Sequence, residues 1–171
     1  MLIYLVGYMA SGKSYTGSRL ASKLGIRFID LDHSIEEKYR ISIKNFFLKY
    51  GEDQFRIIEN QMLHRTFQLA DAVIATGGGT ACYFDNMEQM NRHGLTIYLK
   101  QDAEEVFQRL KRSKKPRPML SASPDPELKE EILTQLRERV PYYEKAHIIF
   151  DIHKMNIHQL ANEVLQYKNQ F

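Results

Sequence analysis

The sequence predicts an α/β domain built in three layers, with helices on both faces of a five-stranded parallel sheet. The first observation is that short apolar runs alternate with stretches long enough to hold at least one helix. The second is a glycine-rich loop that follows the first apolar run directly and precedes a helical pattern. The length of 171 residues is that of a single domain with an ordinary hydrophobic core. The expected strands are 2–6, 26–29, 72–75, 95–99 and 147–150.

Helices are expected between these strands, and several have typical boundary residues. Asp102 and Pro126 are common at helix starts, whereas Gly25 and Gly94 lie where helices often end. Because open parallel sheets bind ligands beyond the carboxyl ends of their strands, the residues at those ends should converge on one site. The expected helices are 13–24, 33–39, 43–49, 52–69, 84–92, 102–111, 127–140 and 157–169.

Two segments interrupt the alternation of strand and helix. Residues 32–62 contain more helix than one crossover needs, which indicates an inserted helical subdomain that binds a substrate. Residues 112–126 contain four prolines among serines and charged residues, which indicates a mobile lid. The single domain of 1–171 therefore divides into this insertion, this lid and a core made of 1–31, 63–111 and 127–171.

The composition argues against several classes of function. Twenty-four Lys and Arg against 21 Asp and Glu give a net charge of +3, too small an excess for a dedicated nucleic-acid binder, so no nucleic-acid partner is expected. No apolar stretch approaches the roughly 20 residues that cross a bilayer, so no membrane contact is expected. Cys82 is the one cysteine, and no signal peptide is recognisable. The default expectation is a reducing, cytoplasmic location.

Residues 7–14 are expected to form a phosphate-binding loop, because they match G-x-x-x-x-G-K-[ST] between an expected strand and an expected helix. The glycines let successive backbone N–H groups curl around phosphate oxygens. Lys13 reaches the outer phosphates, and the Ser14 hydroxyl can ligate Mg²⁺. A nucleoside triphosphate is therefore the first ligand to expect. A plain glycine-rich turn at a helix start is the other interpretation.

Two carboxylates, Asp30 and Asp32, stand at the end of the second apolar run. Residues two apart in an extended chain point to the same side, so both should face one cavity. Near a nucleotide, one of them can hold Mg²⁺ while the other accepts the proton of an attacking hydroxyl. The alternative is that one or both cap the helix expected to begin near His33.

Three consecutive glycines, residues 77–79, follow the third expected strand, where a nucleotide hydrolase more often has an aspartate for magnesium. Because these residues carry no side chains, a ligand can approach the backbone closely and meet its N–H groups directly. This favours a ligand-binding segment, and a plain loop is the alternative interpretation.

Three arginines are candidates for binding anionic groups. Arg56 can bind a substrate carboxylate with two parallel hydrogen bonds, or it can form an ordinary surface ion pair with Glu52 or Glu59. Arg117 lies between two prolines in a basic segment that can close over a triphosphate, although a solvated charge run is the usual interpretation of such a segment. Arg139 can point into the cleft or cap the end of its helix.

Taken together, these motifs resemble the signature set of the shikimate kinase family. The resemblance covers nearly the whole chain and keeps the family's order and approximate spacing. It implies a P-loop kinase fold, a monomer, and transfer of the γ-phosphoryl group of MgATP to the 3-hydroxyl of shikimate, in the biosynthesis of chorismate and the aromatic amino acids. The matching motifs are residues 7–14, Asp30-Leu31-Asp32, Phe55-Arg56-x-x-Glu59, residues 77–79, Arg117-Pro118 and Arg139-x-Pro141-x-Tyr143.

The resemblance also implies a role for each matched residue. Asp32 contacts the shikimate hydroxyls and serves as the base, while Lys13 and Arg117 act on the phosphates during transfer. Ser14 and Asp30 support magnesium. The other residues implied to bind ATP are Ala10, Ser11, Gly12 and Tyr15, and those implied to bind shikimate are Arg56, Gly77, Gly78, Gly79 and Arg139.

Some positions depart from the family pattern. Ala10 stands where many relatives have glycine, and Tyr15 stands where they commonly have threonine. After the last strand, Met155 stands where relatives often have arginine. We expect Met155 to pack on adenine and Lys154 to supply charge nearby, so both are candidate ATP-binding residues.

Other functions share part of this pattern. Gluconate-type and nucleoside monophosphate kinases also have the loop and a basic lid, but the paired aspartates, the glycine triplet and the two spaced arginines favour a small hydroxylated carboxylate. A nucleotide-dependent regulatory switch is less compatible, because the chain contains no N-K-x-D motif that reads guanine. A nucleic-acid module that uses the basic run at 109–117 is disfavoured by the small net charge.

Overall fold

The computed structural model describes residues 1–112, 125–151 and 154–168. Within these ranges the strands form one parallel sheet, as the sequence predicts, in the order β2-β3-β1-β4-β5. Two strands have the predicted bounds, and the bounds of the other three differ by one residue at each end. The strands are β1 (Leu2–Val6), β2 (Arg27–Asp30), β3 (Ala72–Ala75), β4 (Gly94–Lys100) and β5 (Ile148–Asp151).

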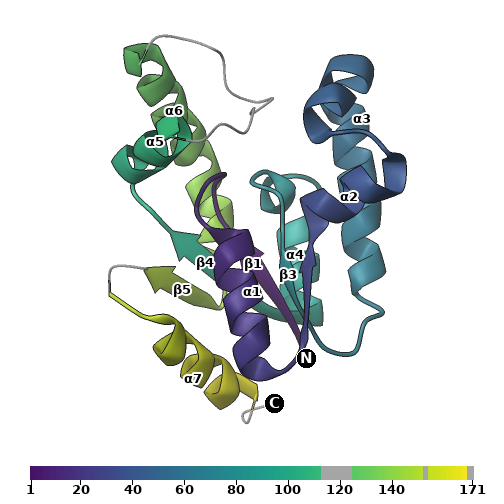
Figure 1. The fold of residues 1–171 in the computed structure, drawn as a ribbon, viewed down its shortest axis with the longest axis vertical. Coiled ribbons are helices and arrows are strands. Elements are labelled where there is room, and N and C mark those ends of the chain that lie inside the picture. The colour runs from purple at the N-terminus through teal and green to yellow at the C-terminus, as the bar shows by residue number, and fades with distance from the viewer. Residues whose placement is uncertain (113–124, 152–153, 169–171) are drawn as a thin grey trace.

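Helices cover both faces of this sheet and extend beyond one of its ends (Figure 1). In Figure 1 the α2–α3 pair and the α5–α6 pair lie on opposite sides of the region above the strands. No helix in the described part of the chain is both long and apolar enough to cross a membrane. The helices are α1 (Lys13–Leu24), α2 (Leu31–Tyr39), α3 (Ile43–Thr66), η1 (Thr80–Cys82, a 3₁₀ helix), α4 (Asn86–His93), α5 (Ala103–Arg112), α6 (Asp125–Tyr143) and α7 (Ile157–Lys168).

The two faces of the sheet bury separate hydrophobic clusters, because successive side chains of a strand point to opposite faces. Ile3 and Leu5 of β1 pack with α1 and α7 on one face. Tyr4, between them, belongs to the cluster that includes residues of α3, α4 and α6 on the other face. This two-sided burial accounts for the continuous apolar run of β1, which is completely buried.

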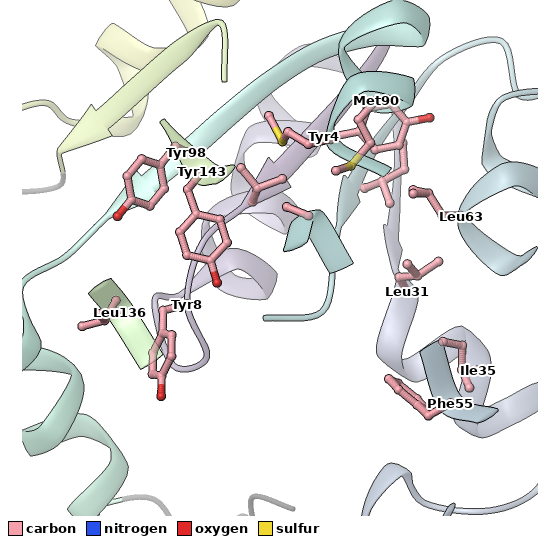
Figure 2. Packing of buried hydrophobic residues seen from close by; sticks show 14 of the residues in the cluster. Tyr4, Tyr8, Leu31, Ile35, Phe55, Leu63, Met90, Tyr98, Leu136 and Tyr143 are labelled. Carbon is pink, nitrogen blue, oxygen red and sulfur yellow. The ribbon is translucent and has the colours of Figure 1, made fainter. Parts of the chain in front are cut away.

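The second cluster extends to the carboxyl ends of the strands and supports the helices around the site. The rings of Tyr98 (β4) and Tyr143 (α6) have centroids 5.2 Å apart. Figure 2 shows these rings and Tyr8 in one part of the cluster, and Ile35 and Phe55 of the helical insertion in another. The same core therefore anchors α6 and the α2–α3 pair on either side of the phosphate-binding loop.

The helical insertion differs in detail from the predicted one. Helix α2 begins at Leu31, earlier than predicted, because the Asp30 side chain accepts a hydrogen bond of 3.2 Å from the His33 N–H and caps the helix. The two helices predicted at 43–49 and 52–69 are halves of α3, which is interrupted at Gly51 (φ 81°, ψ 171°).

Only the ends of the predicted lid fall within the described residues. Arg112 is the last residue of α5, and Asp125 and Pro126 begin α6. The predicted lid arginine, Arg117, lies outside the described residues. At its other end, α6 continues past the predicted residue 140 and includes Pro141.

Candidate active site

The phosphate-binding loop adopts backbone conformations that favour glycine. Gly7 and Gly12 have φ values of 139° and 88°. A side chain on Gly7 would also place its Cβ 2.9 Å from the carbonyl oxygen of Leu99. Ala10 has φ 61°, also in the left-handed region, which gives a physical reason for the glycine expected there in many relatives. The predicted strand, loop and helix are therefore all present.

The first turn of α1 is open to an anion. Gly12 precedes the helix without a capping side chain, and the first turn contains no acidic residue. The N–H groups of that turn and the helix dipole therefore favour a negatively charged ligand. This geometry supports the predicted binding of phosphate.

Lys13 is buried against the loop that it is predicted to serve. Its ammonium donates to the carbonyl oxygens of Gly7 and Tyr8 at 2.7 and 2.8 Å and to the Ser11 hydroxyl at 3.4 Å. Only 8% of the residue is exposed. Phosphate oxygens in the loop would therefore meet a lysine whose position is already set by the backbone.

Ser14 and Asp30 form the pair of oxygen donors predicted for magnesium. The Ser14 hydroxyl donates to Asp30 Oδ2 at 2.5 Å, while Asp30 Oδ1 is the cap of α2. The described residues contain no group of three or more His, Cys, Asp or Glu that could hold a metal by themselves. Mg²⁺ usually takes one or two protein oxygens and completes its shell with water and phosphate, so this donor set fits a nucleotide-bound Mg²⁺.

Asp32 lines the predicted cavity, but it does so from a helix and not from the predicted extended strand. It lies in the first turn of α2 and not in an extended strand, so the alternation argument for Asp30 and Asp32 is wrong. Both carboxylates nevertheless line one cavity of about 350 Å³, which we call the loop cavity. The other predicted residues in its lining are Ala10, Gly12, Lys13, Ser14, Tyr15 and Gly78.

The glycine triplet packs against three different parts of the site. A Cβ on Gly77 would come 2.9 Å from Asp32 Oδ1, and one on Gly78 would come 3.0 Å from the Met9 nitrogen of the loop. One on Gly79 would lie 2.6 to 2.8 Å from three atoms of the Arg56 guanidinium. The absence of side chains is thus required by close packing within the protein. Direct contact of these glycines with a ligand stays a prediction.

Arg56 forms both of the ion pairs that the sequence allows, but it is not at the surface. Only 5% of the residue is exposed. Its Nη1 donates to Glu59 Oε2 at 2.8 Å, and its Nε and Nη2 donate to Glu52 Oε1 at 3.1 and 2.8 Å. The Tyr83 ring centroid lies 4.2 Å from Cζ of this guanidinium. The predicted surface pair is therefore a buried network.

Electrostatics within this network keep Glu52 ionised. Burial alone would raise the pKa of Glu52, but hydrogen bonds from Tyr83 and Arg56 and the charges of Arg56 and Arg139 outweigh it. The pKa of Glu52 is consequently below its ordinary value. For Arg56, burial disfavours the charged form. The Glu59 charge and the hydrogen bonds that Arg56 donates to both glutamates outweigh burial and raise the pKa of Arg56 above its already high value.

Arg139 is buried without a carboxylate partner. Only 8% of the residue is exposed, and its guanidinium carbon lies 5.4 Å from the ring centroid of Tyr8 in the phosphate-binding loop. Among the described residues, no carboxylate lies within ion-pairing distance of this guanidinium. One helical turn further along α6, the Tyr143 hydroxyl donates to the carbonyl oxygen of Gly78 and ties α6 to the glycine triplet. Arg139 is therefore buried beside the phosphate-binding loop, and its contact with a ligand stays a prediction.

A second cavity of about 390 Å³, the nucleotide-side cavity, adjoins the loop on the side of β5 and α7. The predicted residues Ser11, Gly12 and Tyr15 line it. Its lining also contains polar residues that the sequence motifs do not indicate, namely Arg19, Arg109, Asn156 and His158. The sequence contains two signals for these residues: Arg109 belongs to a basic run, and residues 156–158 lie directly before and within the start of a helix.

Arg109 is held against the loop by two acceptors. Its Nη1 donates to the Ala10 carbonyl at 3.3 Å. With the amide of Gln101 oriented so that its oxygen faces the guanidinium, that oxygen accepts from Nη1 and Nη2 at 2.6 and 2.9 Å. Lys154 and Met155, the predicted adenine contacts, are not in the lining of this cavity. Lys154 pairs with Asp151 at 3.6 Å, and Met155 packs on the core beside α7.

Comparisons with known proteins agree on one family. The family model described as shikimate kinase matches residues 9–168. The shikimate kinase of Parabacteroides distasonis is 43% identical over 168 residues, covering 96% of this chain and 97% of that protein. The crystal structure of shikimate kinase from Bacteroides thetaiotaomicron has a TM-score of 0.86 at 38% identity, covering 99% and 97% of the two chains. That of the Acinetobacter baumannii shikimate kinase in complex with shikimate has a TM-score of 0.86 at 35% identity, covering 99% and 93%.

Proposed function

The chain belongs to the shikimate kinase family, and we propose on that premise that it transfers the γ-phosphoryl group of ATP to the 3-hydroxyl of shikimate. The products are shikimate 3-phosphate and ADP. The observation that carries the proposal is that Arg139 is buried beside the phosphate-binding loop and forms no ion pair with any carboxylate in the described part of the chain. Although the charge of Arg139 acts on Glu52, no described carboxylate forms an ion pair with this guanidinium, so the carboxylate of the acceptor can pair with it directly.

The donor half of the reaction uses the loop cavity. Backbone N–H groups of the loop and the start of α1 bind the phosphates, and Lys13 holds the outer ones. Ser14 and Asp30 hold Mg²⁺, which neutralises charge on the phosphate oxygens when it is bound. The Ser14–Asp30 hydrogen bond supports this assignment, because it already brings the two oxygens together. Adenine occupies the nucleotide-side cavity, between Arg109 and the start of α7.

The acceptor half lies between α6 and α3. Arg139 and Arg56 bind the carboxylate of shikimate, and the backbone of residues 77–79 lines its path. Asp32 accepts hydrogen bonds from the shikimate hydroxyls and takes the proton of the 3-hydroxyl as that oxygen attacks the γ-phosphorus. This role is supported by its place in the loop cavity with Lys13, Ser14 and Asp30. Most of the rate enhancement comes from positioning and charge stabilisation.

Two parts of the proposal rest on the sequence resemblance. Arg117 is the lid arginine that stabilises charge on the transferred group. The protein acts as a monomer. The proposed cytoplasmic location rests instead on the single cysteine of the sequence.

The test is ADP release from MgATP by the purified protein, with shikimate, gluconate and several nucleoside monophosphates as separate acceptors. We expect turnover with shikimate alone, and we expect EDTA to abolish it. Activity with gluconate or a nucleotide, and none with shikimate, would overturn the assignment. Arg139→Lys keeps the positive charge but loses the planar pair of donors. We expect this variant to bind shikimate more weakly with an unchanged KM for ATP, which would show that Arg139 binds the shikimate carboxylate.

A further inference from the structure

Glu52 occupies a position that the proposed reaction does not explain. It is the first residue after the interruption of α3 at Gly51. Its side chain is 32% exposed, whereas the side chains of its network partners Arg56 and Glu59 are 6% and 1% exposed. Glu52 is thus the one carboxylate of this ion-pair network that solvent, and hence a ligand, reaches directly.

One oxygen of Glu52 accepts three hydrogen bonds. Oε1 receives Arg56 Nε at 3.1 Å, Arg56 Nη2 at 2.8 Å and the Tyr83 hydroxyl at 2.7 Å. The charge of Arg139 also acts on this carboxylate. A carboxylate held by one arginine within the field of the second is the arrangement proposed above for the acceptor. Glu52 therefore reproduces, inside the protein, the interactions of the ligand.

The donors of Arg56 are divided unequally between the two glutamates. A guanidinium has five N–H bonds, and Glu52 accepts hydrogen bonds from the Nε–H and from one N–H on Nη2. These two N–H groups lie along one edge of the guanidinium, and such an edge can bind a carboxylate with two parallel hydrogen bonds. Glu59 takes one on Nη1, and it is held from its other oxygen by the Thr80 hydroxyl at 2.6 Å. Glu59 is consequently the permanent partner of Arg56, and Glu52 is the replaceable one.

The charges of the network lead to the same conclusion. Arg56 and Arg139 contribute two positive charges, and Glu52 and Glu59 contribute two negative ones, so these four residues are neutral before any acceptor binds. An acceptor carboxylate that enters while Glu52 stays in place adds an uncompensated negative charge close to Glu52. That repulsion disappears if Glu52 moves to solvent. Glu52 directly follows the interruption of α3 at Gly51, and its side chain is already 32% exposed, so it lies at the edge of the network from which it can move to solvent.

From this geometry we infer that Glu52 is an internal stand-in for the acceptor carboxylate: it occupies the Nε–Nη2 edge of Arg56 in the ligand-free protein and is displaced when the acceptor binds. The inference rests on the proposed function and deepens it. Glu52 keeps Arg56 oriented and compensated while the site is empty. It also makes binding selective, because a ligand without a carboxylate has no means of replacing it.

The test compares Glu52→Gln, Tyr83→Phe and the control Asp53→Asn, which removes the neighbouring charge of an exposed residue on α3. Calorimetric titration gives the Kd for shikimate and for its uncharged methyl ester. Glu52→Gln should bind shikimate about 3- to 10-fold more tightly, because a neutral amide competes less well for Arg56 than a carboxylate does. Tyr83→Phe loses one hydrogen bond to Glu52 but keeps the ring on Arg56, and it should bind shikimate about 2- to 3-fold more tightly.

The gain should appear in the KM for shikimate and not in the KM for ATP, and the methyl ester should bind all variants alike. Asp53→Asn should match the wild type within about twofold. If Glu52→Gln binds shikimate no more tightly than the wild type, Glu52 is only a positioning partner of Arg56 and the inference is overturned. An equal gain for the methyl ester overturns it as well. A wild-type protein that binds ATP but no shikimate overturns the proposed function, and this inference with it.

Discussion

Replacing Gly79 by alanine tests whether the position of Arg56 controls acceptor binding. The backbone of Gly79 has φ −101° and ψ −15°, which alanine adopts without strain, so the substitution adds a methyl group and changes nothing else locally. That methyl carbon would lie 2.6, 2.7 and 2.8 Å from Nη2, Nη1 and Cζ of Arg56. The expected effect is therefore a displacement of the guanidinium.

The size of this effect follows from the contacts of Arg56. Carbon atoms in contact are about 3.5–4.0 Å from their neighbours, so the guanidinium must retreat by roughly 1 Å. Its bonds of 2.8 Å to Glu52 and Glu59 then exceed the range of a good hydrogen bond. A misplacement of about 1 Å in a substrate-positioning group costs up to about 100-fold in rate, so kcat/KM for shikimate should fall by up to about 100-fold.

The assay is steady-state kinetics with each substrate varied in turn. The KM for ATP should change little, because Gly78 and not Gly79 contacts the phosphate-binding loop. A double-mutant cycle with Arg56→Lys separates the clash from a general loss of structure, since lysine has no planar group at that position. If Gly79→Ala lowers kcat/KM equally in the wild-type and Arg56→Lys backgrounds, the reasoning from the guanidinium contact is refuted.

Three further predictions concern other parts of the site. Asp32→Asn should lower kcat by about 10²- to 10⁴-fold, while its Kd for ATP stays near that of the wild type. Near-normal turnover would exclude Asp32 as an essential base. Gln101→Leu should raise the KM for ATP by about 3- to 10-fold, because Arg109 loses one of its two acceptors, whereas Gln101→Glu should not raise it. A shift in the KM for shikimate alone would contradict this role. Burial raises the pKa of the Cys82 thiol from 9.0 to about 11. Iodoacetamide at pH 8 should therefore alkylate Cys82 about 100-fold more slowly in the folded protein than in urea. Equal rates would show that burial does not protect the thiol.

Local sequence patterns predicted the bounds of an element well where a residue next to the boundary determines it. Strand β1 ends where predicted because Gly7 adopts a conformation that a strand residue does not. For Asp30 the sequence offers magnesium binding and helix capping as alternatives, yet one oxygen caps α2 while the other accepts a hydrogen bond from the Ser14 hydroxyl. The pattern identified the right residue, but a carboxylate has two oxygens and can serve two purposes.

The prediction was incomplete where burial decides the role of a residue. The spacing of Arg56 from Glu52 and Glu59 allows an ion pair with either one, and helix geometry alone cannot tell an exposed pair from a buried network. Burial of this face of α3 comes from contact with residues 79–83, which are distant in sequence. Likewise, the nucleotide-side cavity combines α1, α5 and the start of α7, so no local pattern distinguishes its residues from ordinary surface positions.

The glycine triplet connects the donor and acceptor halves of the site. Gly77 approaches Asp32 and Glu59, the partner of Arg56, while Gly78 approaches the phosphate-binding loop and Gly79 approaches Arg56 itself. Three successive residues therefore lie against the proposed base, the loop and the network of the proposed carboxylate anchor. Neighbouring Cα atoms are 3.80 Å apart, which makes this backbone a short spacer of nearly constant length. Transfer requires the hydroxyl to be about 3–3.5 Å from the phosphorus, and an error of 1 Å costs up to about 100-fold in rate. A side chain at any of the three positions would move one group relative to the other two, so the missing Cβ atoms set the geometry of transfer even where no glycine touches a substrate.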